Sequence, residues 1–364
     1  MAIDRRLVAN VDWPLLAAAL LIGLIGVATI ASVTRSGPAA GLYLKQLSLL
    51  ALGVVLLVLA TSVDYRRLVD RSPLLYLLGL AALVAVLFSK EVVETHRWLS
   101  LGGGLRLQPS EFVKPLTALL MAKIFAESRR ETLGLTDLAG PGAAVAAAAA
   151  LIASQPDLGT AVSLLPIFVT VAFLAGLRPR AILWLVVTMT LVGAFAWKFA
   201  LRDYQKQRVY TFLDPSLDPM GAGYQKIQSE IAVGSGGLTG KGYGRGSQSQ
   251  LGYLPARQTD FIFSVLAEEL GFLGVAATLG LYLFVLWRCF GVAMTARDRA
   301  GAFLVAGVTA SLAFQVVYNT AMVAGLVPVK GLPLPLMSYG GSSLLSSLLG
   351  VGLILNVRMR RFAN

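Results

Sequence analysis

The chain has 364 residues, of which 56% are hydrophobic and only 14% are charged. Soluble globular proteins carry about 25% charged residues, so this composition excludes an ordinary soluble domain and indicates a membrane protein with many spans. The formal net charge of +12 comes from scattered basic residues without a recognition motif, a pattern typical of cytoplasmic loops that argues against nucleic-acid binding.

The chain contains one cysteine and one histidine, Cys289 and His96. A single cysteine excludes an internal disulfide and a Cys-rich metal cluster. A single histidine excludes a metal site built from several histidines, and we interpret His96 as a loop residue rather than a catalytic base.

Ten apolar segments approach the roughly 20 residues that a helix needs to cross a bilayer. The first exceeds the ~7–15 apolar residues of a signal peptide, so we expect it to be retained as a span. The predicted spans are residues 13–33, 41–62, 73–89, 112–126, 135–154, 158–177, 181–201, 261–287, 300–326 and 338–357. The sequence thus predicts an all-α polytopic membrane protein with a single domain over residues 1–364.

Arginines set the orientation of these spans. With the N-terminus inside, every short connection on the cytoplasmic side is basic, as the positive-inside rule requires. We therefore predict ten transmembrane helices with cytoplasmic N- and C-termini. The arginines are Arg5, Arg6, Arg66, Arg67, Arg71, Arg129, Arg130, Arg178, Arg180, Arg288, Arg297, Arg299, Arg358, Arg360 and Arg361.

Two long connections are then extracellular: residues 89–111 between spans 3 and 4, and residues 202–260 between spans 7 and 8. In the second, Tyr224, Ile227 and Ile231 have the i, i+3, i+7 spacing of an amphipathic helix, which we expect on the membrane surface.

Eight glycines lie between residues 233 and 252. The pair Gly240-Lys241 does not fit the nucleotide-binding P-loop pattern, so we predict no nucleotide cofactor. Two interpretations stay open: a flexible loop, or backbone N–H groups that cradle an anion with help from Lys241 and Arg245.

Several charged residues fall near the outer ends of spans. Glu111 and Lys114 are three residues apart, so they can pair and close a helix end, or line a site. Asp157 lies in a turn between two spans, where it can cap a helix or face a cavity. The last outer connection, residues 319–343, is rich in proline and small residues, which we interpret mainly as packing.

The stretch LPARQTDFIFSVLAEELGFLG, residues 254–274, places three carboxylates at a membrane span. Carboxylates at membrane depth are costly and usually functional. If Asp260 is counted on the helix, Glu268 lies about 80° away around it and Glu269 on the opposite side. Asp260 is therefore predicted to stand alone, while Glu269 is predicted to pair elsewhere in the bundle.

Five blocks of sequence, taken together, resemble the SEDS family, the RodA/FtsW/SpoVE proteins of bacterial cell-wall synthesis. The resemblance covers nearly the whole chain. The blocks lie at residues 97–114 (RWLSLGGGLRLQPSEFVK), 155–160 (QPDLGT), 234–244 (GSGGLTGKGYG), 254–274 and 325–343 (GLVPVKGLPLPLMSYGGSS).

Two details refine the resemblance. GSQSQ at residues 246–250 is most like RodA, the member that acts in cell elongation. Gln258 stands where the family often has histidine, which argues that this position is not the base. Asp260 matches the family's essential aspartate.

The resemblance implies a peptidoglycan glycosyltransferase in the bacterial cytoplasmic membrane. Such enzymes polymerise lipid II, a disaccharide-pentapeptide on undecaprenyl pyrophosphate, into a nascent glycan strand on the outer face of the membrane during elongation. Their implied partners are membrane lipid and a class B penicillin-binding protein, a transpeptidase.

The implied chemistry needs a base and positive charge. Asp260 would take the proton of the attacking hydroxyl, and a lone carboxylate suits a single, inverting displacement. The departing pyrophosphate needs cations from the protein or a divalent metal, Mg²⁺ or Mn²⁺. The residues expected to bind substrate are Glu111, Lys114, Asp157, Arg97 and Lys241.

An alternative function is transport, in which the protein is a flippase that moves lipid II across the bilayer. Ten spans, proline-interrupted helices and intramembrane charges suit a transporter. However, a transporter binds its substrate near the midplane, whereas the polar residues here concentrate in the outer half. This bias favours chemistry on the outer face.

Overall fold

A computed structural model describes residues 10–34, 40–88, 97–100, 106–128, 130 and 132–361. Arg5, Arg6, His96, Arg129 and part of the predicted outer connection 89–111 lie outside this range. The elements are α2 (Trp13–Val33), α3 (Leu42–Ser62), α4 (Tyr65–Asp70), α5 (Ser72–Leu87), β1 (Leu99–Ser100), β2 (Arg106–Leu107), α6 (Pro109–Glu127), α7 (Leu135–Ser154), α8 (Leu158–Leu174), α9 (Pro179–Phe195), η1 (Ala196–Ala200), α10 (Asp203–Leu213), η2 (Pro215–Leu217), α11 (Ala222–Ser235), α12 (Ser247–Gln250), α13 (Ile262–Met294), α14 (Arg299–Val323) and α15 (Gly341–Met359).

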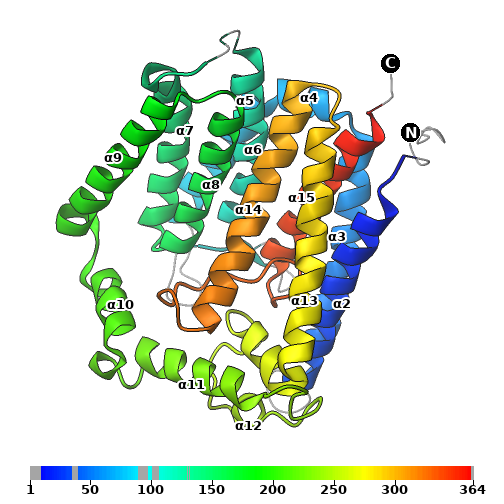
Figure 1. The fold of residues 1–364 in the computed structure, drawn as a ribbon, viewed down its shortest axis with the longest axis vertical. Helices are drawn as coiled ribbons and strands as arrows, with labels where there is room; N and C mark the ends of the chain where they lie inside the picture. The colour runs from blue at the N-terminus through cyan, green and yellow to red at the C-terminus, as the bar shows by residue number, and fades with distance from the viewer. Residues whose placement is uncertain are drawn as a thin grey trace.

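Long apolar helices form a bundle (Figure 1). Within the described residues, seven are long and apolar enough to cross a membrane: α2, α3, α7, α9 with η1, α13, α14 and α15. Two more, α5 and α8, are apolar but shorter, and α6 has 19 residues and carries charges. A helix therefore stands at each predicted span, and the prediction of a mainly helical, multi-pass membrane protein is confirmed.

Helix α15 lies inside the bundle, packed against α3, α6 and α14. Glycines make this packing tight. A Cβ at Gly352 would lie 2.9 Å from the carbonyl oxygen of Leu57, and a Cβ at Gly53 would lie 2.3 Å from Leu348 Cδ1. Small residues let helices approach closely in membranes, where van der Waals packing drives association.

Ion pairs join the elements at one end of the bundle, where α2 begins and α15 ends (Figure 1). Arg288 pairs with Asp12 at 2.7 Å, and Arg66 pairs with Asp298 at 3.0 Å. The arginine-rich connections between helices lie at this end, so the charge asymmetry read from the sequence is a property of the fold.

Helix α9 stands at the edge of the bundle (Figure 1). It packs only lightly on α7, and among the residues of α9 itself only Ala181 is buried. Leu183, Leu191 and Phe195 are more than 60% exposed. Such a face fits a lipid environment, and the helix continues through η1 towards α10.

The connection between α9 and α13 is ordered into helices at the other end of the bundle (Figure 1). The predicted amphipathic helix is confirmed as α11. Ser229 of α11 is buried, where its hydroxyl donates to the carbonyl oxygen of Val323 at 2.8 Å and lies 2.9 Å from Ser264 Oγ. Ile227 and Ile231 of the same helix are exposed.

The glycine-rich stretch packs backbone to backbone against a break in α13 at Gly271 (φ 64°). Lys241 N donates to the carbonyl oxygen of Glu268, and Gly242 N to that of Glu269, both at 3.0 Å. Phe272 N donates back to the stretch, to a glycine carbonyl. The glycine-rich stretch thus supplies hydrogen-bond partners to backbone groups of α13 at the break in the helix. Neither of the two interpretations left open by the sequence, a flexible loop or an anion cradle, describes these contacts.

A substitution at Gly240 tests this packing. Gly240 has φ +79°, and a Cβ there would lie 2.1 Å from the carbonyl oxygen of Glu269. We expect Gly240→Ala to lower the free energy of unfolding by more than about 2 kcal/mol, through backbone strain and a clash. Gly234→Ala is the control, because a Cβ at helical Gly234 meets open space and should stabilise by roughly 0.5–1 kcal/mol. Equal unfolding midpoints for the two variants would contradict this explanation.

Candidate active site

Asp260 lies in the turn that precedes α13, two residues before the helix begins. The sequence interpretation counted it on the helix, and that detail is wrong: Phe261 is the N-cap residue. The predicted separation still holds, since Glu268 and Glu269 contact other groups, described below.

Hydrogen bonds from the α14 side hold the backbone around Asp260. Asn319 of α14 donates its Nδ2 to the carbonyl oxygens of Asp260 (2.9 Å) and Leu332 (2.8 Å). Ser338 donates its hydroxyl to the carbonyl oxygen of Thr259 at 2.6 Å. The turn is therefore fastened to α14 and to the connection between α14 and α15, which fixes the backbone that carries the Asp260 side chain.

Gly331 lies against the Asp260 carboxylate. A Cβ at this position would lie 3.2 Å from Asp260 Oδ2, and the backbone has φ +59°. Only glycine adopts this conformation without strain and leaves the carboxylate uncrowded. The connection 319–343, interpreted from its sequence as packing, thus also forms the wall of the candidate site.

Charged neighbours and burial set the ionisation of Asp260. Burial raises the pKa of Asp260 to about 6, the positive charges of Arg208 and Arg97 act to lower it, and the negative charge of Asp157 raises it. Desolvation disfavours the charged form of a carboxyl group, while nearby cations favour it. A carboxylate with a pKa near neutrality is suited to accept a proton at physiological pH.

The hairpin β1–β2 brings Arg97 to Asp157. Arg97 precedes β1, and its guanidinium donates to the carbonyl oxygens of Gln155 (2.8 Å) and Pro156. Gln108 follows β2 and donates its Nε2 to Asp157 Oδ2 at 3.0 Å. Asp157 also caps α8 by accepting from Thr160 N at 3.1 Å. The interpretation of Asp157 as a helix cap is therefore confirmed, and its charge is also among those that act on Asp260.

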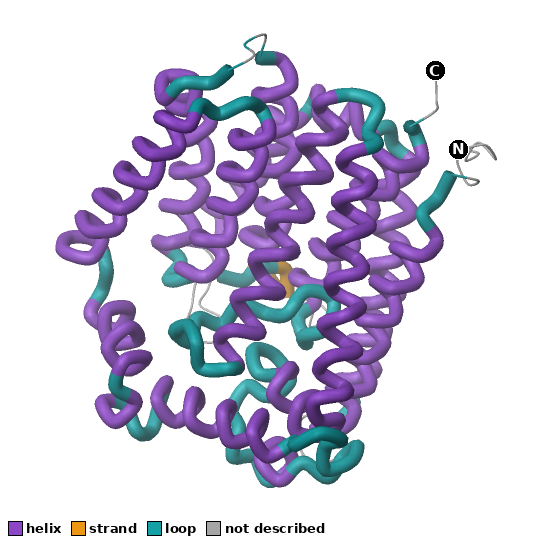
Figure 2. Tube along the Cα trace, viewed as in Figure 1, coloured by secondary structure: helices purple, strands orange, loops and turns teal. Residues whose placement is uncertain are grey.

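Two further cations belong to segments near this turn: Arg208 is among the charges that act on Asp260, and Lys330 directly precedes Gly331. Arg208 of α10 donates Nη1 to the carbonyl oxygen of Val329 at 3.1 Å. Burial lowers the pKa of Lys330, and the positive charge of Arg208 lowers it further. The loop between α14 and α15, which carries Lys330, lies towards the end of the bundle that faces α10–α12 (Figure 2).

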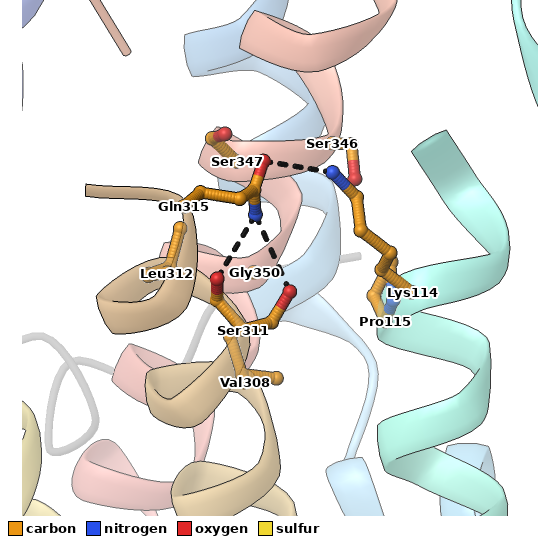
Figure 3. A pocket seen from close by; sticks show the side chains of 9 residues that line it. All are labelled: Lys114, Pro115, Val308, Ser311, Leu312, Gln315, Ser346, Ser347 and Gly350. Carbon is orange, nitrogen blue, oxygen red and sulfur yellow. Dashed lines mark hydrogen bonds between the residues drawn. The ribbon is translucent and has the colours of Figure 1, made fainter. Parts of the chain in front are cut away.

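Glu111 and Lys114 form a buried ion pair at 2.8 Å inside α6. Lys114 also donates to Gln315 Oε1 of α14 at 2.9 Å, and Gln315 donates to Ser311 (Figure 3). A cavity of about 20 Å³ adjoins this cluster beside Ser346, close to the minimum volume of about 10–15 Å³ that holds one water molecule. The predicted pairing is confirmed, although neither charge is among those that act on Asp260.

The remaining predicted binding residue, Lys241, pairs with Glu268 instead. Its Nζ lies 2.7 Å from Glu268 Oε1, and the backbone N–H groups of Gln248 and Ser249 donate to the same carboxylate. Glu269 accepts from Ser32 of α2. These two glutamates fasten the glycine-rich segment and α2 to α13, so the predicted structural pairing of Glu269 is confirmed and Lys241 is not brought to Asp260.

The site therefore contains part of the predicted set and some residues that the sequence interpretation missed. Asp260, Asp157 and Arg97 are brought together, whereas Glu111, Lys114 and Lys241 form structural pairs. Arg208 and Lys330 were missed, although each is a basic residue in a predicted outer connection.

Comparisons with known proteins show the family of this chain. A family model of FtsW, RodA and SpoVE, described as cell cycle protein, matches residues 9–362. The peptidoglycan glycosyltransferase MrdB of Escherichia coli K12 is 39% identical over 94% of this chain and 92% of its own. The peptidoglycan glycosyltransferase RodA of Treponema pallidum is 32% identical over 98% of this chain and 99% of its own.

Solved structures share the fold. One, from a study of the structural coordination of polymerization and crosslinking by a peptidoglycan synthase complex, has a TM-score of 0.82 and 33% identity, and covers 97% of this chain and 99% of that chain. The rod shape determining protein RodA of Thermus thermophilus has a TM-score of 0.72 and 32% identity over 97% of this chain and 98% of its own. The chain belongs to the FtsW/RodA/SpoVE family.

Proposed function

We propose that Asp260 is the general base with which this chain extends glycan strands from lipid II during cell elongation. The chain is a peptidoglycan glycosyltransferase, as its family and its similarity to MrdB and RodA establish. The observation that carries the proposal is a single buried carboxylate in a turn held by Asn319 and Ser338, on which Arg208 and Arg97 act and whose pKa is raised to about 6.

The proposed reaction is one displacement at a sugar carbon. A hydroxyl of the acceptor attacks the anomeric carbon of the donor, Asp260 accepts the hydroxyl proton, and the bond to the lipid pyrophosphate breaks. Because Asp157 is engaged as a helix cap, Asp260 acts alone, and a single displacement inverts the anomeric centre. A double displacement would need a second free carboxylate about 5 Å away.

Positive charge around Asp260 would receive the leaving pyrophosphate. Preorganised cations stabilise negative charge as it develops, without the cost of reorganising water. Arg208, Lys330 and Arg97 are the candidates in the described part of the chain, and they replace Lys241 in the proposal because its ammonium group is held by Glu268.

We propose ten spans with both termini in the bacterial cytoplasm and Asp260 at the outer face. This topology is supported by the helix that stands at each of the ten predicted spans and by the arginine-rich end opposite Asp260, which the positive-inside rule assigns to the cytoplasm. The related structure of a synthase complex for polymerization and crosslinking supports a crosslinking partner, which we propose is a class B penicillin-binding protein.

A resident metal does not fit the described residues, where no three His, Cys, Asp or Glu side chains gather. The oxygens of Asp157 already accept hydrogen bonds from Thr160 N and Gln108. Mg²⁺ is often held by one carboxylate and the substrate's phosphates. Mg²⁺ or Mn²⁺ would therefore arrive with the pyrophosphate, and chelation tests whether polymerisation needs it.

The flippase alternative draws support from the polar cluster around Lys114, which lies inside the bundle. Its cavity of about 20 Å³ is far too small for a disaccharide-pentapeptide. The deciding experiment reconstitutes the purified protein in liposomes that contain labelled lipid II. We expect glycan chains on a gel. Labelled lipid that crosses the membrane without any polymer would instead favour transport.

The charges around Asp260 predict opposite shifts in pH dependence. The base works when ionised, so the rate of polymerisation should fall as the pH drops through the pKa of Asp260, about 6. Arg208→Gln removes a charge that lowers this pKa, so the acidic limb of the pH–rate profile should move to higher pH. Asp157→Asn should move it to lower pH. If the acidic limb of the pH–rate profile lies at the wild-type pH in both variants, its assignment to Asp260 is contradicted.

A further inference from the structure

A second cleft opens at the end of the bundle opposite Asp260. It has a volume of about 500 Å³ and lies between the α6–α7 and α8–α9 connections. Leu133 N donates to the carbonyl oxygen of Gly176 at 2.9 Å, and Arg178 N donates to that of Leu133 at 3.1 Å, which fixes the two connections to each other. We call it the basic cleft; its lining residues are Arg130, Thr132, Gly134, Thr136, Asp137 and Arg178.

The basic cleft carries more positive than negative charge. Arg130 pairs with Asp137, the one acidic lining residue. Arg178 donates its Nε to Thr132 Oγ1 at 3.0 Å and has no ion pair with a carboxylate in the described part of the chain. A guanidinium presents a planar fork of donors that matches a phosphate, and threonine hydroxyls can add further donors.

An apolar surface continues directly from this cleft. Arg178 is the N-cap residue of α9, the helix whose face is uncovered, with Leu183 63% and Trp184 56% exposed. Only a light contact joins α9 to α7. A phosphate held in the cleft therefore lies where acyl chains attached to it would cover the exposed apolar face of α9. A soluble anion has no acyl chains and would leave this face exposed.

We propose that the basic cleft binds the phosphate headgroup of an anionic phospholipid, with its acyl chains along α9. Basic pockets between membrane helices on the cytoplasmic side are suited to such headgroups. The proposal rests on the topology proposed above, which places this end in the cytoplasm. Because α9 leads through η1 into α10, which carries Arg208, the bound lipid would steady the helix that presents a cation to Asp260.

The test is a lipid titration of the purified full chain in detergent, followed by native mass spectrometry with phosphatidylglycerol and, separately, phosphatidylcholine. The double variant Arg130→Gln, Arg178→Gln should bind phosphatidylglycerol about 30-fold more weakly, since each basic residue contributes roughly 1 kcal/mol. The matched control, Arg180→Gln with Arg297→Gln, removes the same charge from the same end of the bundle outside the cleft and should bind like wild type.

A variant with the opposite expected effect guards against misfolding. Asp137→Asn removes the carboxylate of the cleft but keeps an oxygen that can accept from Gly134 N, as Asp137 does at 2.9 Å. It should bind phosphatidylglycerol more tightly. The proposal would be overturned if the cleft variant and the control bound phosphatidylglycerol equally, or if wild type bound phosphatidylcholine as tightly as phosphatidylglycerol. Displacement of the bound lipid by inorganic phosphate or by an acidic peptide would also overturn it.

Activity separates this proposal from the proposed function. Lipid II polymerisation by wild type in phosphatidylcholine nanodiscs reports on Asp260 alone, whatever the lipid titration gives. Adding phosphatidylglycerol should raise the rate for wild type and the control but not for the double cleft variant. A rise of the same size in the cleft variant would contradict the link from the basic cleft through α9 to Arg208.

Discussion

Replacing Asp260 by asparagine is expected to lower the rate of glycan polymerisation on the order of 10²- to 10⁴-fold, the usual contribution of a general base. Asparagine has the shape of aspartate but does not accept a proton at neutral pH. The fold should persist, because Asn319 contacts the backbone oxygen of residue 260 and not its side chain. Lipid II binding should therefore change little, so the loss belongs to kcat rather than KM.

The control for this variant is Asp203→Asn. Asp203 is an exposed carboxylate at the start of α10, in the same outer connection as Asp260. Its loss removes one negative charge from that connection without touching the turn before α13. Steady-state polymerisation with labelled lipid II measures both variants. A similar loss in both would indicate an effect of overall charge and remove the reason to assign the base to Asp260.

Breaking the buried pair in α6 is expected to have the largest effect on stability. Lys114→Met leaves the Glu111 carboxyl group 2% exposed and without its partner. Removing one member of a buried ion pair costs about 3–5 kcal/mol, because the other charge stays buried and uncompensated. Glu111→Gln leaves Lys114 with Gln315 alone and should also destabilise strongly.

A double-mutant cycle separates this pairing from simple loss of packing. The double variant Glu111→Gln, Lys114→Met removes both charges, so it should recover much of the stability lost in each single variant. Glu127→Gln on the same helix is the control, since its pair with Lys123 is exposed and such pairs contribute about 0–1 kcal/mol. Unfolding in mixed micelles measures all four. Additive losses in the cycle would show that the two side chains act independently.

Hydropathy and charge predicted most of the fold. Segments such as residues 13–33 and 42–62 are helices because a bilayer leaves an apolar chain no other way to satisfy its backbone. Asp260 was identifiable for the same reason, since a carboxylate next to an apolar span is costly. The start of α13 was predicted about one residue early, because nothing in the sequence shows the contacts of Ser338 and Asn319 that hold the preceding turn.

The partners of each charge were not predictable. Lys241 pairs with Glu268 across 27 residues of sequence, and Arg208 reaches the site from α10, far along the chain from α13. Helical spacing shows only neighbours within one helix, so the Glu111–Lys114 pair was visible and these were not. The role of the glycine-rich stretch was not predictable for a related reason. Its glycines allow the backbone to approach α13 closely, and this contact depends on tertiary structure.

The pH dependence of polymerisation by wild type and Asp260→Asn decides whether Asp260 is the base. Purified protein and labelled lipid II give the rate as the pH falls from neutral through about 6, the pKa of Asp260. We expect the wild-type rate to fall as one proton binds to Asp260, while Asp260→Asn stays slow and loses this pH dependence. Equal polymer from both proteins, with the same acidic limb, would contradict the assignment of Asp260 as the base.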